Sequence, residues 1–193
     1  MPEENTQNTT QPVKKILPLV PLRNLVLFPS VEHPIFVGRK ETVNSILHAY
    51  NNTNKLVIIT AQKSFQTEKP TLQDLYTVGV LARIEHIVQT DGNINAVIKG
   101  ISRINITSLL QFEPFPLVEY VDLPIIPESV EDIKTSADAL LNQIKKSISL
   151  GRHFDLPAIM QLSVGVSSSD LADQVCFSVD ANHQERQSML EML

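Results

Sequence analysis

The chain has 193 residues, of which 42% are hydrophobic and 19% charged, a composition typical of a globular protein with one sizeable core or two small ones. Sixteen basic and 21 acidic side chains give a formal net charge of -5. Residues 13–124 are nearly neutral, which speaks against the basic face that nucleic-acid binding requires, and the single cysteine excludes an internal disulfide or a multi-cysteine metal site.

The first residues, MPEENTQNTTQP, are polar and acidic and lack the apolar stretch of a signal peptide. We therefore expect a disordered tail over residues 1–13. No apolar run reaches the roughly 20 residues that a membrane-spanning helix needs. The sequence accordingly predicts a cytoplasmic protein.

A proline-rich apolar stretch, LPLVPLRNLVLFPSVEHPIFVG, follows the tail. It predicts two strands, Leu17–Leu22 and Val26–Val37, which the prolines require to be edge, bulged or bent strands. Arg23 lies between them and has two interpretations. Its guanidinium could bind an acidic partner, or it could hold a bend by donating to backbone carbonyls, the interpretation we favour.

A helix is predicted next, because four apolar residues recur at spacings of three and four: Val43, Ile46, Leu47 and Tyr50. The run KLVIIT is typical of a buried strand. Thr71 and Asp74 have the spacing of a capping box, which marks the start of a further helical turn.

The middle of the chain predicts a β-hairpin. Two alternating runs, VGVLARIEHIVQ and INAVIKGISRINI, flank Asp91-Gly92, one of the strongest hairpin signals. The alternation shifts phase near Glu85-His86 and near Gly100, which predicts bulges there. The run FPLVEYVDL predicts one more strand.

The sequence pattern changes after Pro124 from alternating, strand-like runs to apolar residues at helical spacing. We therefore divide the chain into a β-rich part, residues 14–124, and an α-helical part, residues 125–193. Ser129 should cap a helix of about 20 residues that ends before Gly151. Three shorter helices are expected in LPAIMQLS, DLADQVCFSV and HQERQSMLEML. The last has no stop signal, which suggests a piece of a longer protein. Cys176 should be a core thiol.

Local catalytic motifs are not found in the sequence. No lysine has the preceding glycine of a P-loop, and GVSSS at 165–169 lacks the final glycine of a nucleophile elbow. The five histidines include no i, i+4 pair of the kind that binds zinc on a helix. We therefore expect a binding module with no catalytic, cofactor or metal residues, although a site assembled from distant residues stays possible.

The opening stretch resembles the start of the N-terminal domain of the Lon protease family, whose pattern is P-L-R-[DN]-x-V-x-F-P followed by P-[LI]-x-V-G-R. The resemblance continues through LYTVGVLARI, the Asp-Gly hairpin and VIKGISRINI to RQSMLEML, and covers residues 16–193. It implies an α+β fold: a PUA-like β pseudobarrel with one or two short helices, followed by an α-helical bundle.

The resemblance also implies a function. Family members are ATP-dependent serine proteases that assemble as homohexamers, and their ATPase and protease domains, with ATP and magnesium, follow the N-terminal region. This chain would recognise unfolded or degron-bearing proteins and support the hexamer. The alternatives are a stand-alone binding protein of the same fold, a PUA-like RNA-binding module, and an enzyme with a dispersed site.

A recognition surface needs exposed apolar side chains, and the proline-rich opening could provide them without a strongly aggregating edge. Four residues are therefore candidates for a substrate-contacting patch: Pro21, Leu22, Phe28 and Pro29. The competing interpretation is that Leu22 and Phe28 are core residues and that the prolines only shape bends.

Overall fold

The computed structural model describes residues 13–124, 130–149 and 168–192 and has the expected α+β composition. In chain order the elements are β1 (Lys15–Leu22), β2 (Glu32–Val37), α1 (Lys40–Asn52), β3 (Leu56–Ala61), the short 3-10 turn η1 (Leu72–Asp74), β4 (Val78–Thr90), β5 (Asn93–Gln111), β6 (Leu117–Asp122), α2 (Val130–Ser149), α4 (Ser168–Ser178) and α5 (His183–Glu191). Within these residues, no helix combines the length and apolar character needed to cross a membrane.

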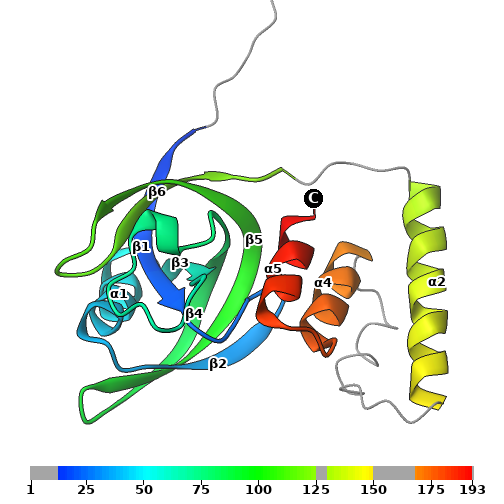
Figure 1. Ribbon diagram of the computed structural model, residues 1–193, viewed down its shortest axis with the longest axis horizontal. Coiled ribbons are helices and arrows are strands. Elements are labelled where there is room, and N and C mark those ends of the chain that lie inside the picture. Colours follow the sequence, from blue (N-terminus) through cyan, green and yellow to red (C-terminus); the bar gives the residue numbers. More distant parts are fainter. Residues whose placement is uncertain (1–12, 125–129, 150–167, 193) are drawn as a thin grey trace, which may run out of the picture.

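The six strands form one sheet in the order β2-β5-β4-β3-β1-β6, and β5 also pairs with β6. This additional pairing closes five strands into a ring, seen as the rounded body of the molecule (Figure 1). The long strand β5 makes this possible, because its first half pairs with β2 and its second half with β6. Strand β2 therefore lies outside the ring, as an edge strand.

Strand β1 accommodates two prolines because each of its halves has a single partner. Lys15–Pro18 pairs with β6, and Leu19–Leu22 pairs with β3. A proline nitrogen cannot donate to a ladder, so it is tolerated where one side of the strand has no neighbour. The expected strand over Leu17–Leu22 is confirmed, with two more residues at its start.

The expected strand over Val26–Val37 is wrong in its first half. Residues 23–31 form a loop, and regular pairing begins only at Glu32. Ser30 has a positive φ of 58°, a turn conformation that breaks the strand. The apolar side chains of this loop, Val26, Leu27 and Phe28, are nevertheless buried, which explains why the segment has the hydrophobicity of a strand.

The central hairpin confirms its sequence signal. Asp91 and Gly92 both have positive φ, 50° and 80°, as a two-residue turn of the primed type requires. The β4–β5 register shifts between Ile84 and His86, and again opposite Gly100. Both shifts lie where the alternation of the sequence changes phase.

Helix α1 packs against β1 and β3 and buries Val43, Ile46 and Ala49. These residues join one core cluster, while a second cluster forms on the other side of β1 and β3 around Leu19 and Ile58. The expected capping box is present at η1, where the Asp74 carboxylate accepts from both the backbone N–H and the hydroxyl of Thr71.

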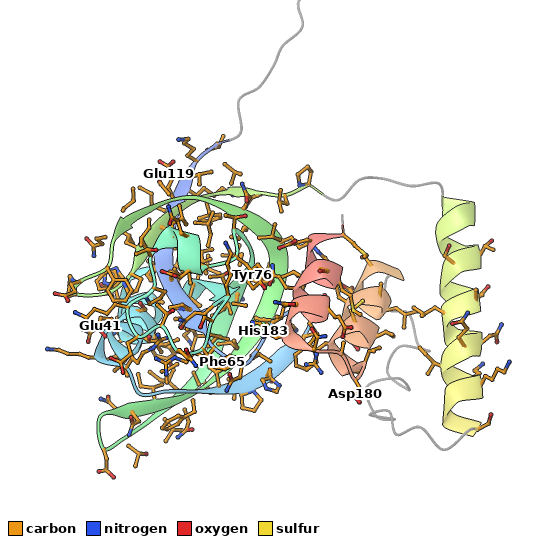
Figure 2. All side chains as sticks on the ribbon, in the orientation of Figure 1. Glu41, Phe65, Tyr76, Glu119, Asp180 and His183 are labelled. Atoms are coloured by element: carbon orange, nitrogen blue, oxygen red, sulfur yellow. The ribbon has the colours of Figure 1, made fainter. Side chains whose placement is uncertain are left out.

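Helices α4 and α5 are fixed to the ring by a buried polar contact. Arg103 of β5 donates Nη1 and Nη2 to the Asp173 carboxylate at 3.0 and 2.5 Å, and Nε to the Leu190 carbonyl at 2.9 Å. Leu190 belongs to the first core cluster. His183 of α5 lies beside Tyr76, with ring centroids 6.2 Å apart (Figure 2).

Further contacts connect α4 to the segment around β2. Ser30 donates its hydroxyl to Asp170, and the His33 ring meets Phe177 edge to face at 5.2 Å. Cys176 is partly buried and packs against the first core cluster, as expected of a core thiol. The helices α4 and α5 are thus attached to the β-rich part through its core.

Helix α2 lies on the far side of α4 from the ring (Figure 1). Its bounds, Val130–Ser149, agree with the predicted helix of about 20 residues. The caps expected at Ser129 and Gly151 and the short helix expected over residues 156–163 fall outside the described residues. The PUA-like assignment, the helical bundle and the domain boundary at residue 124 stay predictions.

Candidate functional site

An open cavity of ≈ 570 Å³ lies between the end of β1 and strand β2. This volume is within the range of ligand-binding pockets, about 300–1,000 Å³. Three segments line it: the end of β1 with the following loop, all of β2 after its first residue, and the start of α1 with the two residues before it. The lining residues are Pro21, Leu22, Arg23, Asn24, Leu25, His33, Pro34, Ile35, Phe36, Val37, Gly38, Arg39 and Thr42.

The cavity has a buried apolar floor and an exposed apolar rim. The floor consists of four buried residues that line the cavity: Pro21, Leu22, Ile35 and Val37. Phe36 is 66% exposed, an unusual position for a phenylalanine. The strand alternates, so that inward residues support the core while outward residues, Phe36 among them, face solvent.

The free edge of β2 borders this cavity. Gly100 of β5 accepts from Ser30 N–H at 3.1 Å and donates to the Val31 carbonyl at 2.9 Å, so its backbone groups point toward the β2 segment. Antiparallel ladders alternate, and the β2–β5 register has no shift. The backbone groups of His33, Ile35 and Val37 therefore pair with β5, and those of Glu32, Pro34 and Phe36 point outward.

Two arginines at the cavity hold the neighbouring loop. Arg39 donates Nη2 to the Pro21 carbonyl at 2.7 Å and Nη1 to the Glu68 carbonyl at 3.1 Å. Arg23 donates Nη2 to the Thr67 carbonyl at a long 3.5 Å, and its buried Nε has no hydrogen-bond partner. Burial, followed by the nearby charge of Arg23, lowers the pKa of Arg39 from its ordinary value.

No ion pair with another described residue neutralises the charge of this arginine pair. Among the described residues, the salt bridges involve Lys14, Lys15, Lys69 and Arg103, and neither cavity arginine. Glu41 and Glu68 lie near enough to affect Arg39 but do not line the cavity. Figure 2 labels Glu41, in the first turn of α1, and Phe65, an exposed side chain in the loop that the arginines hold.

The four residues of the predicted patch separate into two pairs. Pro21 and Leu22 are buried but line the cavity. Phe28 is fully buried in the first core cluster, and Pro29 is buried beside it; neither lines the cavity. All four side chains are buried, and contact of any of them with a substrate stays a prediction.

Sequence reasoning missed two residues of this site. The sequence predicts a strand at Phe36 but not its exposure, although the alternation Ile35-Phe36-Val37 indicates that Phe36 faces away from its two neighbours. Arg39 makes shorter contacts with backbone carbonyls than Arg23, the residue that the sequence favours for holding the bend. In the sequence, both residues belong to PIFVGR, the segment that fits the family pattern P-[LI]-x-V-G-R.

Within the described ranges, no three His, Cys, Asp or Glu side chains are placed to hold a metal ion. The chemistry of the cavity is that of an apolar hollow with two cations and a free strand edge. Such an arrangement can bind a polypeptide through its backbone, apolar side chains and negative charge.

Comparisons with known proteins agree on one family. The model of the ATP-dependent protease La (LON) substrate-binding domain matches residues 16–193. The Lon protease of Cytophaga hutchinsonii is 30% identical over 195 residues, covering 98% of this chain and 24% of the relative. The Lon protease of Aquifex aeolicus is 31% identical over 183 residues, covering 92% of this chain and 23% of the relative. The chain thus spans about a quarter of the length of these relatives.

Two solved structures have a similar fold. The N-terminal domain of Mycobacterium avium complex Lon protease gives a TM-score of 0.62 at 15% identity, covering 92% of this chain and 97% of that one. The Lon N-terminal domain protein from Xanthomonas campestris gives 0.50 at 15% identity, covering 93% and 99%. Together with the family match over residues 16–193, these findings show that the chain belongs to the family of Lon protease substrate-binding domains.

Proposed function

We propose that this chain recognises unfolded or degron-bearing polypeptides for an ATP-dependent protease of the Lon type, and that the cavity beside β2 is its binding site. The observation that carries the proposal is the exposed Phe36 on a free strand edge above an apolar floor. Membership of a family of substrate-binding domains supports it.

The physical reason is complementarity with an unfolded chain. Unfolded polypeptides expose apolar side chains and unpaired backbone groups, which folded proteins bury. Burying an aromatic side chain is worth about 1.5–3 kcal/mol, and a free edge supplies backbone hydrogen bonds that do not depend on sequence. Such a site binds many unrelated clients as long as they are extended.

The test uses a fluorescently labelled protein that reduction and alkylation keep unfolded. Phe36→Ser should weaken its binding to this chain several-fold, because the variant removes the exposed ring and leaves the core untouched. Leu110→Ser is the control, since Leu110 is also exposed (48%) but lies on the far half of β5 and does not line the cavity. Equal affinities of the two variants would refute the assignment of the site.

In this proposal, ATP hydrolysis and peptide cleavage belong to other parts of a longer cytoplasmic protein, along with ATP and Mg²⁺. The chain itself would contribute binding and support the assembly of a homohexamer. Purified chain should therefore neither hydrolyse ATP nor cleave a fluorogenic peptide. ATPase or peptidase activity that purifies with the chain and is lost when one of its residues is mutated would contradict this division of roles.

A further inference from the structure

We propose that the occupant of the cavity is an extended client segment that adds to β2 as a strand and places an Asp or Glu side chain on Arg23 and Arg39, within about three residues of an apolar side chain that packs on Phe36. This inference rests on the proposed function and specifies the client chemistry. Three independent features of the described residues support it.

The first feature is the polarity of the free edge. Glu32, Pro34 and Phe36 direct their backbone groups away from β5, and no hydrogen bond among the described backbone groups outside the ladders uses them. The edge offers the carbonyls of all three residues and the N–H groups of Glu32 and Phe36. Pro34 offers no donor, so the carbonyl of an added strand that lies opposite Pro34 finds no partner there. Only alternate residues of the added strand face this edge.

The second feature is the charge at the end of this edge. Arg39 follows β2 by two residues, so its Cα lies about 10 Å along the chain from that of Phe36 at about 3.4 Å per residue. Arg23 lies close enough to Arg39 for their charges to interact, and its one hydrogen bond among the described residues is the long 3.5 Å contact with the Thr67 carbonyl. A guanidinium binds a carboxylate through charge-assisted hydrogen bonds, which are roughly twice as strong as hydrogen bonds to a neutral amide.

The third feature is the apolar surface beside these charges. Phe36 and Pro34 are exposed on the outer side of β2, and Leu25 is half-buried across the cavity. The charged side chains that line the cavity are both cationic, Arg23 and Arg39, so charge complementarity favours an acidic client over a basic one.

The test uses eight-residue peptides with acetylated and amidated ends, so that a side chain supplies the only carboxylate. One peptide carries a phenylalanine and a glutamate three residues apart, and its partner carries glutamine in place of glutamate. Fluorescence anisotropy should give about tenfold weaker binding for the glutamine peptide, as expected for one charge-assisted hydrogen bond. Two further peptides are N-methylated at alternate residues; one should bind weakly and the other normally.

The matched protein variants are Arg23→Gln and Arg83→Gln. Arg83 is an exposed arginine of β4 that does not line the cavity. Arg23→Gln should weaken the glutamate peptide about tenfold and leave the glutamine peptide unchanged, whereas Arg83→Gln should change neither. Should Arg23→Gln fail to fold, comparing the two peptides on the unaltered chain still tests whether the client carboxylate contributes to binding.

Equal binding of the glutamate and glutamine peptides, tolerance of N-methylation in both registers, or binding only when the peptide carries a free C-terminal carboxylate would overturn the inference. Displacement of the peptides by a short RNA with affinity that depends on Arg23 would overturn it too. In each case the proposed function survives if Phe36→Ser still weakens binding of the unfolded protein. Loss of that effect refutes the proposed function instead.

Discussion

Replacing Asp173 by asparagine should weaken the attachment of α4 and α5 to the ring. The Asp173 side chain is 6% exposed and that of its partner Arg103 is 19% exposed, so the pair is largely shielded from water. The substitution preserves shape but removes the charge and directs an amide N–H₂ group toward the guanidinium. Arg103 then stays buried without a counterion.

The expected cost is about 3–5 kcal/mol, the usual penalty for removing one partner of a buried ion pair. This is a large share of the roughly 5–15 kcal/mol that stabilises a typical domain. Burial raises the pKa of Asp173 from its ordinary value although the Arg103 hydrogen bonds oppose the shift. The ionised carboxylate is therefore costly to bury, and its position depends on Arg103.

Urea unfolding measures the total loss, and hydrogen exchange of the α4 and α5 amides shows whether these helices detach first. Asp122→Asn is the control, because the Lys15–Asp122 pair has the same 2.5 Å separation but side chains 47% and 48% exposed. It should have little effect on stability, as is usual for exposed pairs. Equal destabilisation by both substitutions would refute the reasoning, since burial would then not decide the outcome.

Three further outcomes are expected. Gly100→Ala should destabilise the fold by about 1–3 kcal/mol in urea unfolding, because a Cβ there would overlap the Phe28 carbonyl oxygen; a neutral result would show that the loop can shift. Burial and the charge of Arg186 lower the pKa of His33, so its contribution to stability is full above about pH 6.5 and decreases as pH falls toward the folded pKa; His33→Gln should remove this part of the pH dependence. Burial raises the pKa of the Cys176 thiol, so iodoacetamide should modify it more slowly in the native chain than in urea, and equal rates would contradict its packing.

Much of the β-rich part could be predicted from local signals. Asp91-Gly92 adopts the two positive φ angles that the hairpin requires, and Thr71 and Asp74 form the capping box that their spacing indicates. These features depend on a few adjacent residues. The strand predicted over Val26–Val37 was wrong in its first half because burial there comes from the loop packing on Gly100, a contact between segments distant in sequence.

The candidate site was only partly predictable for the same reason. Hydrophobicity identified Pro21 and Leu22, which line the cavity, together with Phe28 and Pro29, which do not. The exposure of Phe36 follows from β2 lying outside the ring, and the arginine pair depends on the contact of the 62–70 loop with the start of α1. Neither the strand order nor this contact can be inferred from periodicity.

The position of β2 outside the closed ring has an evolutionary consequence. Its inward residues, His33, Ile35 and Val37, contribute the packing, while Glu32, Pro34 and Phe36 alternate with them and face solvent. Under the proposed function, mutations at the outward positions change which clients are preferred without a large loss of stability. Descendants of one ancestral fold would then diversify their specificity along a single strand while selection for stability conserves the inward positions.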